Sequence, residues 1–250
     1  MEIALLGYGN MGQRIQVLAE KENHSVPVIL DIENNISGSG MTRPVFEHID
    51  VAIDFSHPAA VQTHIQKLLE LGIPAVIGTT GWLEEPAAVS KLCKQYEGRL
   101  LYGSNFSLGV QLFIKLVARA GELFGKSALF DAALHEVHHT RKADAPSGTA
   151  KTLAGVWLEA AGSSKKPVFQ VPEKQEINKN DFLMTSQRLG SVYGEHQLRI
   201  NSLYDDIMIT HQARSRDAFA AGSLKAASWL VRQEPGFYMI EDVIEEVLRV

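Results

Sequence analysis

The densest group of residues that could do chemistry lies between positions 135 and 142. His135, His138 and His139 are three of the nine histidines, and Arg141 and Lys142 follow directly. The whole chain has a net charge of -5, so this stretch is a local reversal of charge. Imidazole and ammonium groups close together can hold an anion and donate a proton. The pattern predicts a site that binds an anionic small molecule and acts on it.

The residues that follow have the composition of a loop that enters a helix. Pro146 and Gly148 favour a turn, and Ser147 or Thr149 can cap the helix. The first backbone N–H groups of a helix have no partner within it, so those of Gly148 and Thr149 would bind a carboxylate or a phosphate. Cations that face such a helix start suit a ligand with two negative groups.

Two other interpretations of the histidines stay open. Histidines near the end of a strand are often solvated surface residues. Adjacent histidines can also bind a metal ion. However, the sequence offers no second spaced group of ligands, and its single cysteine, Cys93, lies well upstream. We therefore predict no metal site.

A second motif begins at the seventh residue. Its sequence is Gly7-Tyr8-Gly9-Asn10-Met11-Gly12, which matches the GxGxxG pattern of dinucleotide-binding proteins. The first two glycines allow a tight turn and a close approach of the backbone, and the third lets the following helix pack on the strand. The pattern alone is weak, but here it follows an apolar run and opens a helical one. It predicts the pyrophosphate site of a nucleotide.

Asp31 lies where this motif requires an acidic residue, about 20 positions on at the expected end of the second strand. A carboxylate accepts both ribose hydroxyls of NAD but repels the 2′-phosphate of NADP. No lysine or arginine lies between Asp31 and Met41. NADH is therefore the favoured cofactor, with NADPH as the alternative. The other interpretation of Asp31 is a solvated turn residue.

The stretch Gly78-Thr79-Thr80-Gly81 follows another apolar run. In doubly wound sheets the loops at the carboxyl ends of the strands line the cofactor site, so Thr79 and Thr80 are expected on the nicotinamide side. A glycine-rich turn with a capping threonine explains the same residues equally well.

The elements that would position these residues alternate along the first hundred positions. Short apolar runs predict strands, and periodic runs between them predict helices. The strands are expected at 3–6, 26–30, 51–55, 74–77 and 100–102, and the helices at 11–20, 61–69 and 83–96. This rhythm predicts an α/β domain with a parallel sheet of the Rossmann type.

The rhythm changes after Asn105, which predicts a second domain. Helices are expected at 108–124, 148–161, 217–232 and 240–249, and strands at 129–138, 196–202 and 206–210. Residues 163–195 are predicted to be polar and irregular.

Composition excludes several classes of protein. Of the 250 residues, 45% are hydrophobic, enough for a sizeable core, and the acidic excess disfavours nucleic acid as the main partner. No apolar stretch approaches the roughly 18 residues of a membrane-spanning helix, and the N-terminus does not resemble a signal peptide. A single cysteine cannot form a disulfide within the chain. We expect a cytoplasmic protein with no nucleic acid or membrane partner.

The stretch from Glu136 to Ala150 resembles the signature of the 4-hydroxy-tetrahydrodipicolinate reductase family, also called dihydrodipicolinate reductase. The signature is an acidic residue, two histidines, a basic run that ends in lysine, and the seven residues 144–150. Four further stretches agree in order, at 54–56, 78–81, 105–107 and 194–196. The resemblance therefore covers most of the chain.

The resemblance implies a reaction and an architecture. The reaction is reduction of the cyclic unsaturated imine dicarboxylate derived from 4-hydroxy-tetrahydrodipicolinate to tetrahydrodipicolinate with NAD(P)H, in lysine and diaminopimelate biosynthesis. The architecture is a dinucleotide-binding domain, residues 1–107 with 218–250, and a smaller α+β domain, residues 108–217. The mixed, mostly antiparallel sheet of the smaller domain is expected to bind the substrate and build a homotetramer.

The resemblance also implies roles for single residues. His138 takes the position of an acid/base, and Lys142 that of a proton donor. The positions that bind the substrate carboxylates are His139, Lys142, Gly148 and Thr149. The positions on the cofactor side are Gly7, Tyr8, Gly9, Asn10, Met11, Gly12, Asp31, Gly78, Thr79, Thr80, Asn105 and Phe106.

Two departures from the family pattern bear on the cofactor. The family's first glycine loop is usually one residue longer and has a basic residue before the methionine, where this chain has Asn10. Many members have an arginine after the ribose-binding acid, where this chain has Ile32. Both differences remove positive charge near a 2′-phosphate and support the prediction of NADH.

Two rival functions stay open, because a fold alone does not define an activity. One is a two-domain dehydrogenase that acts on a sugar or an amino acid. The other is an NAD-binding sensor without activity. The complete set of His138, His139 and Lys142 argues against the sensor.

Overall fold

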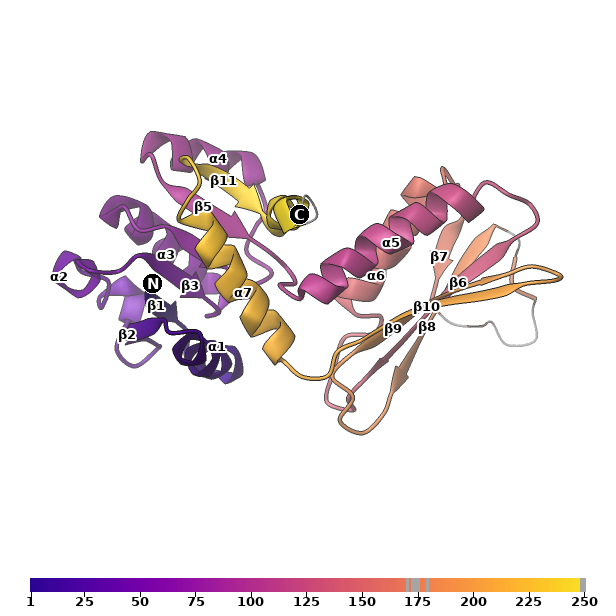
Figure 1. Cartoon of the computed structure of the whole chain (residues 1–250), viewed down its shortest axis with the longest axis horizontal. Coiled ribbons are helices and arrows are strands. Elements are labelled where there is room, and N and C mark those ends of the chain that lie inside the picture. Colours follow the sequence, from indigo (N-terminus) through magenta and orange to yellow (C-terminus); the bar gives the residue numbers. More distant parts are fainter. Residues whose placement is uncertain (170, 172–175, 179, 248–250) are drawn as a thin grey trace. The chain divides into compact units, whose positions relative to one another are not determined.

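The computed structural model describes residues 1–169, 171, 176–178 and 180–247 of the chain. It contains two compact units (Figure 1). Unit 1 consists of Met1–Leu108 and Arg216–Val250, and unit 2 is Gly109–Ser215. The chain therefore leaves unit 1 and later returns to it, and each unit has a sheet of its own.

Unit 1 is built on a six-stranded parallel sheet. Its elements are β1 (Glu2–Leu6), α1 (Asn10–Lys21), β2 (Ser25–Leu30), the 3-10 helix η1 (Ile36–Gly38), α2 (Arg43–Phe46), β3 (Val51–Asp54), α3 (Pro58–Leu71), β4 (Ala75–Ile77), α4 (Pro86–Gln95), β5 (Arg99–Tyr102), α7 (Asp217–Leu230), β11 (Gly236–Met239) and α8 (Ile240–Val247). The strand order is β11-β5-β4-β3-β1-β2, and all neighbouring strands are parallel.

Alternate residues of the central strands enter two separate cores. Ile3 and Leu5 of β1 pack in one core with residues of α1 and α7, whereas Ala4 and Leu6 pack in another with residues of α3 and α4. A strand buried on both faces is apolar throughout, which explains the continuous apolar run in the sequence. Helix α7, from the C-terminal part of the chain, lies beside α1 (Figure 1).

The order of the strands reverses between β1 and β3. These strands are neighbours, yet the helices that follow them, α1 and α3, belong to different cores. Ligands of doubly wound sheets bind outside the carboxyl ends of the strands at such a reversal. Gly7 follows β1 and Phe55 follows β3, so the predicted nucleotide loop lies at this position.

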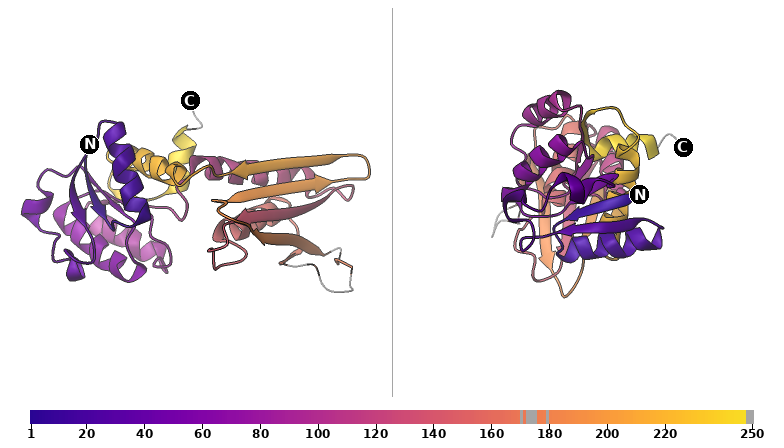
Figure 2. Two further views of the ribbon diagram at one scale, coloured as in Figure 1. Left: turned by 90° about the horizontal axis from the view of Figure 1, so that it is seen from below. Right: turned by 90° about the vertical axis from the view of Figure 1, so that its left-hand side faces the viewer.

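Unit 2 is built on a five-stranded mixed sheet and two helices. Its elements are α5 (Leu108–Phe124), β6 (Asp131–His138), α6 (Gly148–Ala160), β7 (Lys166–Val168), β8 (Asp181–Arg188), β9 (Glu195–Asn201) and β10 (Asp206–Gln212). The strand order is β10-β9-β6-β8-β7. The antiparallel pairs β10–β9 and β9–β6 contribute seven residue pairs each, and the parallel pairs β6–β8 and β7–β8 contribute five and three. The long β9–β10 hairpin is clear in Figure 2, and the predicted fold class is confirmed.

Helix α5 packs on this sheet through one face. Phe113, Val117 and Ala120 lie in the core of unit 2, whereas Lys115 and Arg119 are exposed. With 17 residues, α5 is too short for the roughly 20 residues of a transmembrane helix. None of the helices in the described part of the chain combines the length and apolarity needed to cross a bilayer.

The helix-facing side of the sheet changes in character along its strands. Leu134, Met184 and Leu198 pair across β6, β8 and β9 and belong to the core under α5 and α6. Side chains alternate between the two faces of a strand, so residues two positions further on lie on the same side. These residues are Glu136, Ser186 and His196. One face therefore passes from an apolar core into a polar cluster.

The prediction that residues 163–195 are irregular is wrong. Strands β7 and β8 lie in this range, and β8 pairs with both β6 and β7. Phe182 and Met184 are fully buried, but Ser186 and Arg188 on the same face are polar, so the alternation is visible at one end of β8 only. Residues 170, 172–175 and 179 lie outside the described residues. The short strand β11 was not predicted either.

Candidate active site

Glu136 is the centre of the polar cluster in unit 2. It lies on β6, in register with Ser186 of β8 and His196 of β9, and it is fully buried. A buried carboxylate is unfavourable unless hydrogen-bond donors and positive charges surround it. The residues that satisfy Glu136 therefore define which elements must meet here.

Oxygen Oε1 of Glu136 takes most of the donors. It accepts hydrogen bonds from the backbone N–H of Ser147 at 3.0 Å and from the Ser186 hydroxyl at 2.8 Å, and the Arg188 guanidinium lies 3.4 Å away. Burial by itself raises the pKa of Glu136. The contact with His138 and the hydrogen bonds from Ser147 and Ser186 outweigh burial and hold this pKa well below its usual range. Glu136 is thus a stable anion.

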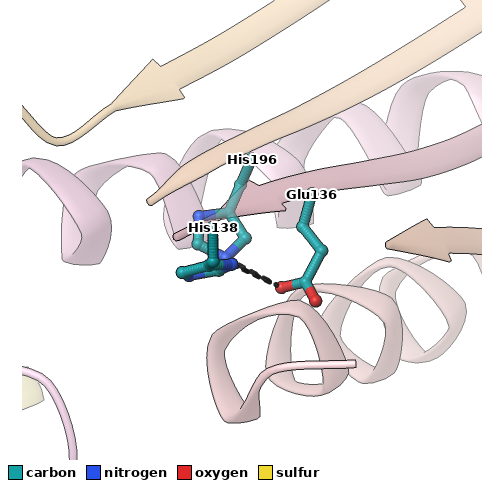
Figure 3. Close-up of side chains that lie close together, drawn as sticks. All are labelled: Glu136, His138 and His196. Atoms are coloured by element: carbon teal, nitrogen blue, oxygen red, sulfur yellow. Dashed lines mark ion pairs between the residues drawn. The ribbon is translucent and has the colours of Figure 1, made fainter. Parts of the chain in front are cut away.

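Oxygen Oε2 faces two imidazole rings (Figure 3). It lies 3.2 Å from Nδ1 of His138 and 3.7 Å from Nε2 of His196. The rings meet edge to face, with centroids 5.2 Å apart. Burial, reinforced by the charge of His138, lowers the pKa of His196 to about 4. His196 therefore stays neutral at pH 7, and it does not compete with His138 for the predicted acid/base role.

Ser147 joins Glu136 to the start of α6. Its backbone N–H donates to the carboxylate, and its Oγ caps the helix by accepting the N–H of Ala150 at 3.1 Å. Gly148 is exposed, and no described atom lies within 4 Å of the position a side chain would take. The first turn of α6 therefore presents its backbone at Gly148 and Thr149, the predicted carboxylate-binding positions.

Arg188 holds the basic loop in the same cluster. Its Nε donates to the carbonyl oxygen of Lys142 at 3.2 Å, and its Nη2 donates to that of Asp144. The Lys142 ammonium lies 2.8 Å from the Asp144 carboxylate, and the resulting hydrogen bond lowers the pKa of Asp144. His139 follows His138 directly and is half-buried. The structure thus brings the predicted catalytic and substrate-binding residues together within unit 2.

Gly194 lies against the ring of His138. A Cβ atom at this position would lie 3.1 Å from Nε2 and 3.4 Å from Cδ2 of the ring. Either distance is shorter than ordinary contact between carbon side chains. The absence of a side chain at Gly194 therefore leaves the ring room to keep its place beside Glu136.

Glu136, His138 and His196 also have the donor types of a metal site. One ligand atom from each residue lies within 4.8 Å of the others. However, the Arg188 guanidinium already faces the same carboxylate, and a second cation would be repelled by it. The predicted absence of a metal stays a prediction.

Several predicted cofactor residues line one pocket of unit 1. The pocket has a volume of about 440 Å³. The predicted residues on its wall are Gly9, Asn10, Met11, Gly78, Thr79 and Thr80. Arg216, just before α7, also lines it. A helix N-terminus beside a guanidinium suits a pyrophosphate.

The three glycines of the first motif have different surroundings. A Cβ at Gly7 would lie 2.5 Å from the carbonyl oxygen of Phe55, and a Cβ at Gly12 would lie 2.3 Å from that of Gly7. At Gly9 no described atom lies within 4 Å. Gly7 and Gly12 are thus needed for packing, and Gly9 leaves the space in which a ligand can approach the backbone.

Asp31 is exposed at the end of β2, within a turn. Its Oδ1 accepts the N–H of Ile32 at 2.8 Å, and its own N–H donates to Oδ1 of Asn34 at 2.7 Å. The stem of Lys67, on α3, lies against Gly38 of η1, because a Cβ at Gly38 would be 2.6 Å from its Cδ and Cε atoms.

The remaining predicted cofactor residues offer less side-chain surface. The Phe106 side chain is 1% exposed and packs edge to face on a neighbouring phenylalanine ring. The Tyr8 hydroxyl donates to Gln16, and its ring packs against the core. Oδ1 of Asn105 accepts the N–H of Ser107 at 3.0 Å. Phe106 therefore offers almost no surface to a ligand and contributes to the packing behind the site.

Several residues at these sites have no role in the sequence predictions. They include Glu136, Ser186, Arg188, Gly194, His196 and Arg216. Gly194 and His196 belong to a stretch that matches the family pattern, which was a usable signal. Arg188 and Arg216 do not belong to any sequence motif. The pairing of β8 with β6 places Arg188 at the site, and the return of the chain to unit 1 places Arg216.

Comparison with known proteins identifies one family. Family models described as "Dihydrodipicolinate reductase, N-terminus" and "Dihydrodipicolinate reductase, C-terminus" match residues 1–106 and 109–244. A 4-hydroxy-tetrahydrodipicolinate reductase of Christiangramia forsetii is 38% identical over 249 residues and covers 100% of both chains. One of Staphylococcus saprophyticus is 35% identical and covers 97% of this chain and 100% of its own.

A solved structure agrees with these matches. The dipicolinate-bound dihydrodipicolinate reductase from Paenisporosarcina sp. TG-14 is 24% identical, with a TM-score of 0.76. The alignment covers 97% of this chain and 99% of the other. The two proteins therefore share a fold across both units.

Replacing His196 by glutamine is expected to make the protein less sensitive to acid. The pKa of His196 falls from 6.5 to about 4 on folding. The unfolded chain therefore binds more protons between these values, and stability falls as the pH falls through this window. Wild type should lose about 2 kcal/mol more than His196→Gln between pH 7 and pH 5, measured by urea unfolding.

The matched control for this measurement is His48→Gln, which replaces an exposed histidine. It should lose as much stability as wild type over the same pH interval. An equal loss in His196→Gln would contradict the assignment of a buried, neutral His196.

Proposed function

The chain belongs to the dihydrodipicolinate reductase family, and from this premise we propose which residues perform its reaction. The enzyme reduces the cyclic unsaturated imine dicarboxylate derived from 4-hydroxy-tetrahydrodipicolinate to tetrahydrodipicolinate, in lysine and diaminopimelate biosynthesis. One observation carries the assignment of residues: the cluster around Glu136 joins His138, the loop of Lys142 and the first turn of α6 within one unit.

The dicarboxylate substrate binds at the start of α6. One carboxylate accepts the backbone N–H groups of Gly148 and Thr149, where the helix dipole favours negative charge. His139 and Lys142 supply positive charge for the ring and its second carboxylate. Ser147 keeps this turn in place, because it is held both by the helix and by Glu136.

His138 and Lys142 handle the proton of the reaction. Hydride addition to the conjugated carbon–carbon double bond places negative charge on the ring atoms, and one proton must then reach the ring. A bound nicotinamide supplies the hydride. The Lys142 ammonium donates the proton, and His138 takes the acid/base role. Glu136 holds the His138 ring in position across their 3.2 Å contact.

The cofactor binds in the pocket at the start of α1. The backbone N–H groups of the first turn and the Arg216 guanidinium neutralise the pyrophosphate, and Gly9 leaves room for its approach. Thr79 and Thr80 bind the nicotinamide side. Asp31 accepts the hydroxyls of the adenosine ribose.

NADH is the preferred cofactor in this proposal. Asp31 repels a 2′-phosphate, and the neutral Asn10 and Ile32 replace basic residues that are usual in the family. The negative charge of Asp31 and the absence of these basic residues therefore support the preference for NADH.

A homotetramer and a cytoplasmic location complete the proposal, and both come from the family resemblance. The sheet of unit 2 supports the oligomer, since α5 and α6 pack on the face that carries Leu134 and Met184. The opposite face, which includes His135 and Thr185, would then meet other subunits.

The function is tested by steady-state reduction of the imine dicarboxylate with NADH and NADPH in parallel. NADH should give a kcat/KM about tenfold higher, which corresponds to about 1.4 kcal/mol of charge repulsion at Asp31. Equal use of both cofactors would contradict the preference alone. Turnover of amino acids or sugars, but not of the imine, would support a different dehydrogenase, and NADH binding without any turnover would support a sensor.

Replacing Lys142 by alanine is expected to lower kcat by about 100-fold or more, because general acid catalysis contributes at least that much. The Kd of NADH, measured by fluorescence, should not change. Lys115→Ala removes an exposed lysine from α5 and is the matched control. Near-normal turnover of Lys142→Ala would refute the assigned role.

Replacing Gly194 by alanine is expected to lower kcat by about tenfold, since its Cβ would lie 3.1 Å from Nε2 of His138 and displace the ring. Gly72→Ala is the matched control, because Gly72 also has a positive φ of 76° and no described atom lies within 4 Å of its added Cβ. If both variants turn over as wild type, the position of the His138 ring does not limit the reaction.

A further inference from the structure

Unit 1 contains a hydrogen-bonded network of buried polar residues to which the proposed mechanism gives no role. Its members are Asp54 at the end of β3, His64 on α3 and Asn35 in the turn after β2. They are 0%, 5% and 7% exposed. Buried polar groups are unfavourable unless they are hydrogen-bonded. A network of three such residues therefore raises the question of which parts of the structure it connects.

Asp54 forms one end of this network. Its Oδ1 accepts the backbone N–H of Ser56 at 2.8 Å and the hydroxyl of Thr79 at 3.2 Å. Its Oδ2 lies 2.8 Å from Nδ1 of His64. Ser56 and Thr79 both line the pocket at the start of α1. The buried carboxylate thus forms hydrogen bonds to two turns that line the pocket.

Asn35 forms the other end. Its Oδ1 accepts the backbone N–H of Gly40 at 3.0 Å, which leaves its amide Nδ2 directed at Nε2 of His64, 3.2 Å away. The Asn35 backbone N–H also donates to the carbonyl oxygen of Asp31 at 2.9 Å. Asn35 therefore closes the turn that carries Asp31.

The donors and acceptors of this network determine which nitrogen of the His64 ring carries the hydrogen. The amide Nδ2 of Asn35 can only donate, so Nε2 of His64 accepts. The ring hydrogen then lies on Nδ1, where it donates to Asp54. His64 therefore links the turn of Asp31 to the turn of Thr79. A side chain that only filled space on α3 would need neither nitrogen.

We infer that His64 is a positioning residue of the dinucleotide site. Its two hydrogen bonds fix the position of the ribose-binding turn of Asp31 relative to the turn of Thr79. The inference rests on the proposed binding of NAD(P)H by unit 1. It adds that binding at the adenosine end and binding at the nicotinamide end of the cofactor are coupled through His64. His64 itself touches no ligand in this account.

Three substitutions separate the two bonds of His64. In His64→Asn the amide nitrogen replaces Nδ1, so the bond to Asp54 can form and the bond to Asn35 cannot. In His64→Gln the amide oxygen replaces Nε2, so the bond to Asn35 can form and the bond to Asp54 is lost. His64→Leu loses both and keeps a similar volume. His48→Gln, at an exposed histidine, is the matched control.

Binding of three ligands is measured by calorimetry for each variant. NADH tests the whole site, ADP-ribose tests it without the nicotinamide, and pyridine-2,6-dicarboxylate tests unit 2. His64→Asn should weaken NADH and ADP-ribose alike, by about tenfold, because the turn of Asp31 is released. His64→Gln should weaken NADH by a similar factor and leave ADP-ribose within about twofold of wild type. The dicarboxylate should bind all variants equally.

A purely structural His64 would lower the melting temperature without this division between ligands. Unchanged binding in His64→Asn and His64→Gln, or equal losses for both ligands in both variants, would overturn the inference. If His64→Leu does not fold, the two amide variants still decide the matter. Wild-type protein that fails to bind NADH at all would sink the proposed function, and the inference with it.

Discussion

The buried charge of Glu136 is the constraint on which unit 2 depends. A buried carboxylate is stable only when hydrogen-bond donors and positive charges converge on it. Here Ser147 in the turn before α6 and Ser186 of β8 donate hydrogen bonds, and Arg188 of β8 and the rings of His138 and His196 lie close to the carboxylate. Three of these neighbours also form or hold the functional site. Ser147 begins α6, Arg188 holds the loop of Lys142, and His138 is the proposed acid/base.

Stability and chemistry are therefore coupled in this unit. Loss of one partner would leave an uncompensated charge in the interior, which is far more costly than loss of a surface ion pair. The same anion fixes the position of His138 and the helix start that receives a carboxylate. Unit 1 shows a related arrangement, in which the buried Asp54 holds the turn that carries Thr79.

The GxGxxG motif predicted a turn between a strand and a helix at residues 7–12, and the structure has β1 before this turn and α1 after it. Local motifs also located His138, Lys142 and the turn before α6, which lie close together in the sequence. The positions of Arg188, His196 and Arg216 follow from strand pairing and from the return of the chain, which no local pattern contains. Strand β8 was missed because Ser186 and Arg188, which contact Glu136, interrupt the apolar alternation in its second half.

A crystal structure of the protein with pyridine-2,6-dicarboxylate would show directly whether the cluster around Glu136 forms the substrate site. One carboxylate should lie on the backbone N–H groups of Gly148 and Thr149, with the ring close to Lys142 and to His138, whose Nδ1 should still face Glu136. A ligand bound away from the start of α6, or a His138 ring turned from Glu136 towards solvent, would contradict it.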